Sequence, residues 1–150
     1  MRAVVQRVRE ASVSVDGTRV AAIGHGMLVL CGIGLNDGEH EIDWLAHKIA
    51  SLRIFDDADG VMNRSVREVK GEILAVSQFT LYASTRKGAR PSYSAAARPE
   101  IARSLFDAFA RSLERHHGAP AARGMFGAHM LVSMINDGPV TLCLDTALRE

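Results

Sequence analysis

The sequence predicts an α+β domain in which two main helices pack against a curved, largely antiparallel, barrel-like sheet. Two observations lead to this prediction. About six segments have the alternating or fully apolar patterns of β-strands, which favour antiparallel pairing, and two segments have apolar residues at helical spacing. The length of 150 residues suits one domain that spans residues 1–150, and no repeat or linker divides the chain.

The first third of the chain is predicted to form strands. Residues 3–8 and 11–15 alternate loosely between apolar and polar types. The Asp-Gly pair at residues 16–17 predicts a hairpin turn, because these residue types adopt positive φ at low cost. The chain returns through residues 19–24, and the apolar run 27–34 predicts a strand at the centre of the sheet.

The first helix is predicted where the hydrophobic period changes. Its apolar positions recur at spacings of three and four residues: Ile42, Leu45, Ile49 and Leu52. Asn36 and Glu39 have the spacing of a capping box, and we expect the helix to end near Arg53. The polar stretch 56–60 then predicts a turn.

The middle of the chain contains a further strand, a loop and the second helix. Residues 72–83 predict the strand, and the polar, basic stretch 84–100 predicts the loop. Pro99 suits the first turn of a helix that continues to about His117. The apolar stripe of this helix consists of Ile101, Leu105, Phe109 and Leu113.

The chain is predicted to end in two strands, at roughly 123–135 and 139–146. On local signals, residues 136–138 form a hairpin turn and Pro139 opens an edge strand. A cis Gly138-Pro139 bond is the alternative. It would aim two successive carbonyl groups in one direction and form an acceptor surface from the backbone alone.

Composition and charge exclude several classes of protein. The 47% of hydrophobic and 23% of charged residues are ordinary for a globular domain, and the formal net charge of +1 neither requires nor excludes nucleic acid. The N-terminal stretch is too polar for a signal peptide, and no apolar run approaches the length of a membrane span. We therefore expect a cytoplasmic protein without a membrane anchor, in which Cys31 and Cys143 are reduced, buried thiols.

The six histidines do not have the spacing of a metal site. His40 and His47 are seven residues apart, and neither a His-x-x-x-His nor a Cys-x-x-Cys pair occurs. The sequence predicts no metal and no other cofactor.

Polar residues stand at the end of the predicted strand 72–83, where a buried strand would need hydrogen-bond partners or a ligand for them. These are Ser77, Gln78 and Thr80, on both sides of Phe79. Ser77 lacks the Gly-x-Ser-x-Gly context of a hydrolase nucleophile, so its hydroxyl group is also consistent with a local hydrogen bond. The loop that follows contains Arg86, Lys87 and Arg90, which either bind phosphates or are simply solvated.

Three motifs together resemble those of the bacterial D-aminoacyl-tRNA deacylases, the D-tyrosyl-tRNA deacylase family. They are SQFTLY at 77–82, KGARPSY at 87–93 and NDGPVT at 136–141. The opening MRAVVQRV and the run LVLCGIG also fit, so the resemblance spans nearly the whole chain. It implies a homodimer without a cofactor that hydrolyses the ester between a D-amino acid and the tRNA 3′ end. Glycine mischarged on tRNA for alanine is implied as a second substrate, and translation quality control as the role.

The resemblance also implies the site. Gly138 and Pro139 would form a cis peptide that enters the active site of the partner subunit, and Arg7 would hold this loop in place. An L-amino acid would drive its Cβ into the carbonyl groups, whereas a D-amino acid or glycine would pass. The facing wall would consist of Ser77, Gln78, Phe79 and Thr80. The acceptor stem or CCA end of the tRNA would be held by Arg86, Lys87 and Arg90.

Two mechanisms and two other functions remain open at this point. Either Thr80 is the nucleophile, or the 2′-hydroxyl group of the tRNA drives the reaction, which the scarcity of titratable groups in the motif favours. Backbone N–H groups near Phe79 and Thr80 would hold the developing oxyanion. The other functions are a non-catalytic RNA-binding module and a small-molecule esterase that uses Ser77.

Overall fold

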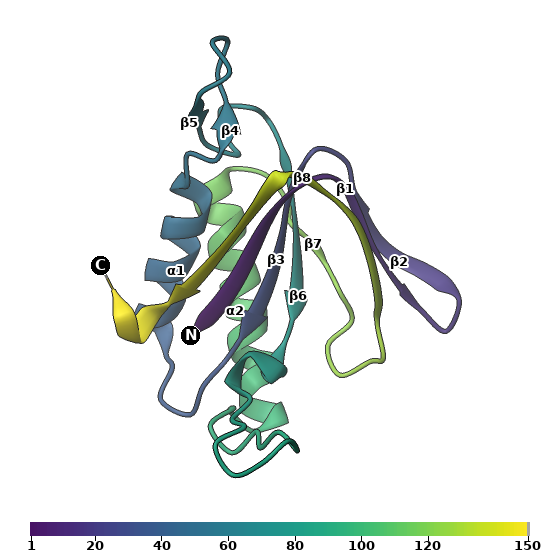
Figure 1. The fold of residues 1–150 in the computed structure, drawn as a ribbon, viewed down its shortest axis with the longest axis vertical. Helices are drawn as coiled ribbons and strands as arrows, with labels where there is room; N and C mark the ends of the chain where they lie inside the picture. The colour runs from purple at the N-terminus through teal and green to yellow at the C-terminus, as the bar shows by residue number, and fades with distance from the viewer. Residues whose placement is uncertain (150) are drawn as a thin grey trace.

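A strongly curved sheet forms the centre of the computed structural model, which describes residues 1–149 (Figure 1). Three of its strands pair antiparallel with β1 (Arg2–Val15): β2 (Thr18–Ile23), β3 (Gly26–Gly32) and β8 (Leu131–Asp145). The first half of β1 lies between β3 and β8, and its second half lies between β2 and β8. The sheet therefore curls around β1 and becomes barrel-like.

Two short parallel pairings complete the sheet. β6 (Glu72–Ser77) runs parallel to β3, and β7 (Ala122–Arg123) runs parallel to β6. A separate small hairpin, β4 (Phe55–Asp56) with β5 (Met62–Arg64), was not predicted from the sequence. The turn expected at 56–60 connects these two strands.

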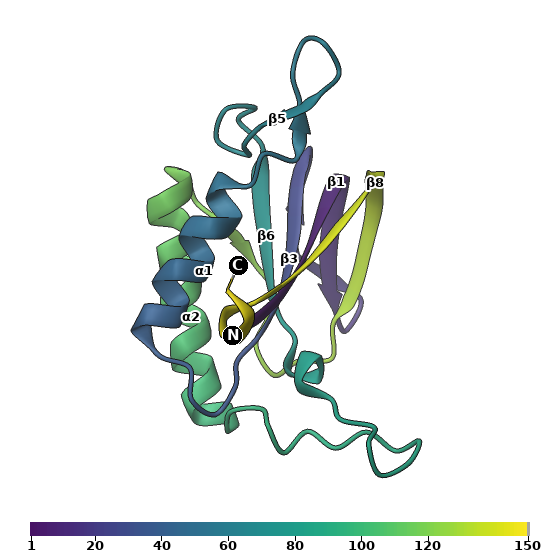
Figure 2. The same cartoon turned by 60° about the vertical axis from the view of Figure 1, so that its left-hand side comes forward.

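Both helices, α1 (Glu39–Ser51) and α2 (Pro99–His117), lie against the same face of the sheet (Figure 2). The core between them and the sheet includes Val5, Val29, Ile73, Leu45, Ile49, Phe109 and Leu113. A second apolar cluster fills the concave side, where the curled sheet packs on itself through Val8, Val13, Leu28, Leu74 and Val76. The predicted α+β fold, with a curved, largely antiparallel sheet and two helices, is confirmed.

Helix α1 begins two residues later than its predicted capping box. The backbone N–H of Gly38 donates to the Glu41 carboxylate at 3.1 Å, so the reciprocal contact involves this pair and not Asn36 and Glu39. Neither α1 nor α2, the helices of the described region, is long and apolar enough to cross a membrane.

The predicted strand 72–83 is wrong in its second half. β6 ends at Ser77, and residues Phe79–Tyr82 form the 3-10 helix η1. The chain folds back over the end of β3 because Gly32 and Gly34 carry no side chain. A Cβ at Gly32 would lie 2.9 Å from the carbonyl oxygen of Gln78, and one at Gly34 would lie 2.7 Å from the Tyr82 ring.

The predicted hairpin at residues 136–138 is also wrong, because β8 is one strand that pairs with β1 both before and after this segment. Its partners include Ser12 opposite Ser133 and Val4 opposite Cys143. Between these two halves, residues 137–140 of β8 lie opposite the single residue Arg7, since Asn136 pairs with Val8 and Thr141 with Gln6. The Gly-Pro pair is therefore a bulge inside a long strand.

The two cysteines differ in exposure. Cys31 is buried in β3 as expected, but Cys143 is exposed, so its predicted burial is wrong. The side chains of β8 alternate here, and Leu142 and Leu144 rather than Cys143 point to the helices and the core.

Candidate active site

A cavity of about 440 Å³ opens where β6 leaves the sheet and the chain turns into η1. Three of the residues predicted for the site line it: Ser77, Gln78 and Phe79. The rest of its wall is mainly apolar and includes Ile33, Ala97, Pro99, Ala102 and Phe126. These residues come from segments far apart in the sequence, so the fold brings them together around the polar end of β6.

The fourth predicted residue, Thr80, does not line the cavity. Its hydroxyl oxygen instead accepts a hydrogen bond from the side-chain amide of Gln78. The backbone N–H groups of Phe79 and Thr80, at the start of η1, donate to no acceptor within residues 1–149. Two free donors therefore stand beside the cavity, where a carbonyl oxygen of a ligand could accept from them.

Aromatic side chains form part of the cavity wall. The rings of Phe79 and Tyr93 meet edge to face, with their centroids 5.0 Å apart and an interplanar angle of 72°. The Phe79 side chain is 56% exposed, although phenylalanine side chains are usually buried. Together with Phe126, these rings provide the flat apolar surfaces on which a nucleobase stacks.

The cavity contains no side chain that could act as a general base. No His, Asp or Glu of the described chain lines it. Burial raises the pKa of the Cys31 thiol, so this residue is protonated at neutral pH and is not a thiolate nucleophile. Within residues 1–149, no three His, Cys, Asp or Glu side chains come together as a potential metal site.

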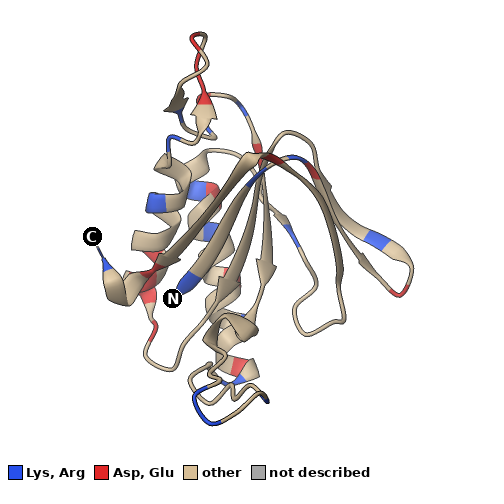
Figure 3. Cartoon of the chain, viewed as in Figure 1, with Lys and Arg blue, Asp and Glu red and all other residues tan. Residues whose placement is uncertain are grey.

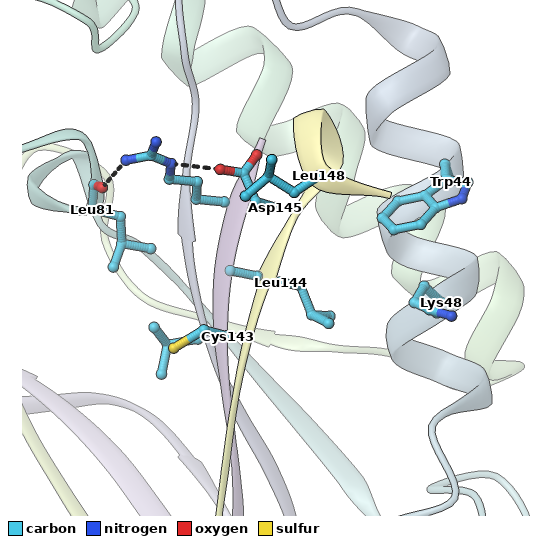
Figure 4. A pocket seen from close by; sticks show the side chains of 10 residues that line it. Trp44, Lys48, Leu81, Cys143, Leu144, Asp145 and Leu148 are labelled. Atoms are coloured by element: carbon cyan, nitrogen blue, oxygen red, sulfur yellow. Dashed lines mark hydrogen bonds and ion pairs between the residues drawn. The ribbon is translucent and has the colours of Figure 1, made fainter. Parts of the chain in front are cut away.

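The C-terminal end of η1 is held by side chains from both ends of the chain. Arg2 donates from Nη1 to the Leu81 carbonyl oxygen and from Nε to Asp145, both at 2.9 Å (Figure 4). Its guanidinium carbon also lies 4.7 Å from the centre of the Tyr82 ring. The Tyr82 hydroxyl donates to Asp37 at 3.2 Å, and burial together with this carboxylate raises the Tyr82 pKa, so the donor stays protonated.

The cavity drawn in Figure 4, of about 490 Å³, lies on the other side of this contact, between β1, β8 and α1. It is lined by Trp44, Lys48, Cys143 and Leu144 among others, and by none of the predicted site residues. Arg2 and Asp145 of its wall are paired with each other. This cavity is therefore separate from the polar end of β6.

The Gly-Pro bulge is held by Arg7, whose side chain is buried although β1 is otherwise apolar at these inward positions. Arg7 Nε donates to the carbonyl oxygen of Asp137 at 3.2 Å, and Nη1 donates to that of Ile54 at 2.6 Å. The Gly138-Pro139 peptide bond is cis. Gly138 has φ +123°, and a Cβ at this position would lie 2.9 Å from Arg7 Nη2. The backbone path at residue 138 therefore requires glycine.

The bulge and the cavity of the same chain lie at different ends of the sheet. In the register of the sheet, Arg7 pairs with Met27 of β3, whereas Ser77 pairs with Cys31 of β3. Met27 and Cys31 are four residues apart, which corresponds to roughly 13 Å along the strand. In Figure 1, β6 points to the bottom of the view, while β8 folds over at the top. Gly138 and Pro139 do not line the cavity of their own chain.

The basic loop projects from the same end of the molecule as the cavity. Arg86, Lys87 and Arg90 are exposed, and none lies within 4.0 Å of a carboxylate among residues 1–149. The loop is closed at its base by backbone hydrogen bonds between Ser84 and Ser92, and it extends beyond the sheet as a separate positive segment (Figure 3). Tyr93, which directly follows it, lines the cavity.

Comparison with known proteins identifies the family. The family model described as D-Tyr-tRNA(Tyr) deacylase matches residues 4–145. The chain belongs to this family. D-aminoacyl-tRNA deacylases of Bacteroides thetaiotaomicron and Opitutus terrae are 55% and 57% identical to this deacylase over 150 residues, which cover both chains completely. The prediction of an aminoacyl-tRNA deacylase, a hydrolase, is confirmed at the level of the family.

Solved structures agree with the fold of the deacylase. The structure titled c-Myc DNA Unwinding Element Binding Protein has a TM-score of 0.92 and 42% identity, and the match covers 97% of this chain and 99% of the other. A probable eukaryotic D-amino acid tRNA deacylase has a TM-score of 0.79 at 17% identity, over 95% and 97% of the two chains. The second likeness shows the shared fold.

Several residues of the deacylase cavity were not predicted from the sequence. Phe126, Ala102 and Arg98 belong to segments outside the three motifs. Arg2 and Asp37, which hold η1, have no local spacing that relates them to residues 79–82. Only the three-dimensional arrangement reveals these contacts.

Proposed function

We propose that this deacylase hydrolyses the ester between a D-amino acid and the 3′ end of tRNA and excludes the L-aminoacyl ester. The observation that carries the proposal is that Ser77, Gln78 and Phe79 line a cavity in which no His, Asp or Glu side chain of the described chain stands. Such a cavity suits a substrate that brings its own reactive group. The membership of the family supplies the reaction type.

The 2′-hydroxyl group of the terminal ribose is the group that promotes attack by water. Water adds to the ester carbonyl, and the carbonyl oxygen gains negative charge. The proton that the water loses passes through the 2′-hydroxyl group to the neighbouring ribose oxygen as the bond to that oxygen breaks, which releases the amino acid and the tRNA. The free N–H groups of Phe79 and Thr80 are suited to bind this oxyanion. Thr80 does not line the cavity, and its hydroxyl oxygen accepts a hydrogen bond from Gln78; both observations favour this mechanism over Thr80 as a nucleophile.

Chiral selection comes from Gly138 and Pro139 of a second copy, which enter the cavity and face the ester. The separation of about 13 Å between the bulge and the cavity of one chain supports a contribution from another chain. The Cβ of an L-amino acid would overlap the main-chain carbonyl groups, whereas a D-side chain points away from them. Overlap of this kind discriminates more strongly than a pocket that lacks one methylene contact, which is worth only about 1–3 kcal/mol. Glycine has no Cβ, so glycine mischarged on tRNA for alanine is a second substrate.

A homodimer is supported by the surface of β8. In the described chain this strand pairs only with β1, and its other edge is free. Large apolar side chains stand exposed along it, namely Leu131, Val132, Met134 and Ile135. A free edge with exposed apolar residues favours association with a second copy. A two-fold axis would then give each cavity the Gly-Pro bulge of the other copy.

The remaining contacts to tRNA come from the aromatic cavity wall and the basic loop. Phe79, Tyr93 and Phe126 are suited to stack on the terminal base. Arg86, Lys87 and Arg90 are suited to bind phosphates of the acceptor stem or CCA end. In the cytoplasm the enzyme would remove misacylated tRNA before it is used in translation.

Deacylation of matched D-tyrosyl-tRNA, L-tyrosyl-tRNA and glycyl-tRNA for alanine tests the proposal. We expect cleavage of the first and third substrates and protection of the second. A protein that binds all three without cleaving any would be an RNA-binding module. Cleavage of activated small esters that is lost in Ser77→Ala would instead indicate an esterase.

Two changes test the mechanism, one in the protein and one in the substrate. Thr80→Ala should retain substantial activity, whereas D-tyrosyl-tRNA that ends in 2′-deoxyadenosine should be stable in the presence of the wild-type enzyme. An inactive Thr80→Ala variant that still binds substrate would assign the nucleophile to Thr80.

A further inference from the structure

We propose that Arg98 and Arg103 form a phosphate-binding subsite at the opening of the cavity, which holds the phosphate group 5′ to the terminal adenosine. This inference rests on the proposed function, because it places the terminal nucleoside in the cavity. It assigns a role to two residues outside the Ser77–Thr80 segment, the basic loop and the Gly-Pro bulge.

The two arginines flank the part of α2 that forms the cavity wall. Pro99 and Ala102 line the cavity, and Arg98, which directly precedes the helix, lines it as well. Positions 98 and 102, and positions 99 and 103, are each four residues apart, so the four residues form one continuous patch on the first turns of the helix. Arg98 lines the cavity itself, and Arg103 contacts Phe126 of the cavity wall.

Two contacts with Phe126 hold the side chain of Arg103, and neither neutralises its positive charge. Its guanidinium carbon lies 4.8 Å from the centre of the Phe126 ring, and Nη2 donates to the Phe126 carbonyl oxygen at 3.4 Å. Phe126 itself lines the cavity. Arg103 has five N–H donors and uses one of them in this hydrogen bond, so others remain to bind a phosphate.

No carboxylate competes for these cations. Within residues 1–149, neither Arg98 nor Arg103 lies within 4.0 Å of an Asp or Glu oxygen, and Glu100 on the same turn pairs with neither. Two other arginines near this helix are paired: Arg115 with Asp43 at 3.2 Å and Arg123 with Glu114 at 2.9 Å. Asp107, one turn after Arg103 on α2, does not pair with it either. Both guanidinium groups are therefore available to an anionic ligand.

The chemistry of the cavity indicates which anion this is. Its wall is apolar and aromatic, and Arg98 is the one cation among the lining residues of the described chain. A nucleoside can be buried against such a wall, but its 5′-phosphate cannot, because a buried charge without a partner is strongly unfavourable. The phosphate must therefore lie at the rim, where the two guanidinium groups are.

The test compares two minimal substrates that differ only in the phosphate: D-tyrosine esterified to the ribose of adenosine, and the same ester of adenosine 5′-monophosphate. For the wild type we expect kcat/KM to be at least about tenfold higher with the phosphate, as for one charge-assisted contact. In Arg98→Gln and Arg103→Gln this ratio should fall several-fold each, and in the double variant it should approach one. Arg111→Gln is the matched control, since this exposed arginine lies further along α2 and away from the cavity.

The ratio is measured within one preparation, so a partly unfolded variant does not distort it. Arg98→Lys should retain part of the preference, because the charge is kept while the planar fork of donors is lost. The proposal is overturned if the wild type has no preference for the phosphate, or if the preference survives in the double variant. Failure to cleave either ester would count against the proposed function instead.

Discussion

Arg7 shows how a single buried charge organises the backbone around it. The residue is only 7% exposed, and a buried cation is tolerated only when its donors find acceptors. Arg7 bonds to Ile54 and Asp137 through their carbonyl oxygens and also meets the Asp56 carboxylate at 3.2 Å. One side chain thus ties the bulge of β8 to the segment that follows α1.

Replacing Gly138 tests the shape of this bulge. In Gly138→Ala the new Cβ would approach Arg7 Nη2 to 2.9 Å, in a backbone conformation with φ +123° that L-residues rarely adopt. We expect the free energy of unfolding to fall by about 1–3 kcal/mol and the ratio of D- to L-tyrosyl-tRNA cleavage to fall at least about tenfold. Urea denaturation and deacylation assays measure the two effects.

Gly60→Ala is the control for this substitution. Gly60 also has positive φ, at +75°, but a Cβ there would meet nothing within 4 Å. This variant should lose some stability through the backbone conformation alone and keep its selectivity. If Gly138→Ala is as selective as the wild type, the bulge does not read chirality.

His117 makes the stability of the fold depend on pH. Burial lowers the pKa of this histidine, and the positive charge of Arg67 lowers it further, while a hydrogen bond to the backbone of Gly71 acts in the opposite direction. The unfolded chain therefore takes up a proton near pH 6.5 that the folded chain takes up only at lower pH. Stability should decrease as the pH falls below about 6.5 towards the folded pKa.

His117→Gln keeps a hydrogen-bond donor and removes the titration. The difference in unfolding free energy between pH 7.5 and pH 5.5 should be smaller in this variant than in the wild type, as measured by chemical denaturation. An unchanged pH dependence would show that other groups account for it.

At the scale of elements, the position of η1 decides what the end of β6 can do. The chain leaves the sheet after Ser77, and the first two N–H groups of the 3-10 turn, those of Phe79 and Thr80, have no acceptor within residues 1–149. The turn is fixed at its far end by Arg2, which contacts both Leu81 and the ring of Tyr82. The proposed catalytic segment is therefore positioned by a residue of the first strand of the sheet.

Arg2→Lys tests this positioning. A lysine lacks the planar fork of donors with which Arg2 reaches Leu81 and Asp145, and it cannot stack on Tyr82 in the same way, so η1 should become less fixed. We expect kcat for D-tyrosyl-tRNA to fall several-fold while KM changes little, because the contact acts on the reacting groups and not on tRNA affinity. In Arg19→Lys, an exposed residue of β2, neither constant should change. An increase in KM alone would place Arg2 in tRNA binding.

Local patterns predicted most elements but not the two that matter most for the site. The strand 72–83 was predicted because its apolar pattern continues through Phe79 and Leu81. The turn at η1 depends on Gly32 and Gly34, more than 40 positions earlier, making room for it. The Gly-Pro pair was assigned to a hairpin because these residues favour turns, whereas pairing with β1 on both sides keeps β8 continuous. Tertiary contacts overrode local preference in both places.

At the scale of the whole molecule, one chain holds both halves of the proposed site but keeps them apart. The cavity lies at one end of the sheet and the Gly-Pro bulge at the other, on the strand whose free edge exposes Ile135 and its apolar neighbours. A symmetric pair of chains would cover the free edge of β8, and it would bring the Gly-Pro bulge of each chain to the cavity of the other chain. The two halves of the site would then be separable by mixing variants.

Mixed dimers provide the decisive measurement. One copy carries Phe79→Glu, which should disable its cavity while leaving its Gly138 intact, and the other carries Gly138→Ala with an intact cavity. Alone, the first should be inactive and the second should cleave both D- and L-tyrosyl-tRNA. When the first copy is added in excess and the subunits are allowed to exchange, each intact cavity should receive an intact bulge. Cleavage of L-tyrosyl-tRNA should then disappear while that of D-tyrosyl-tRNA persists. If the mixture stays unselective although exchange is verified by mass spectrometry, the bulge acts within its own chain or not at all.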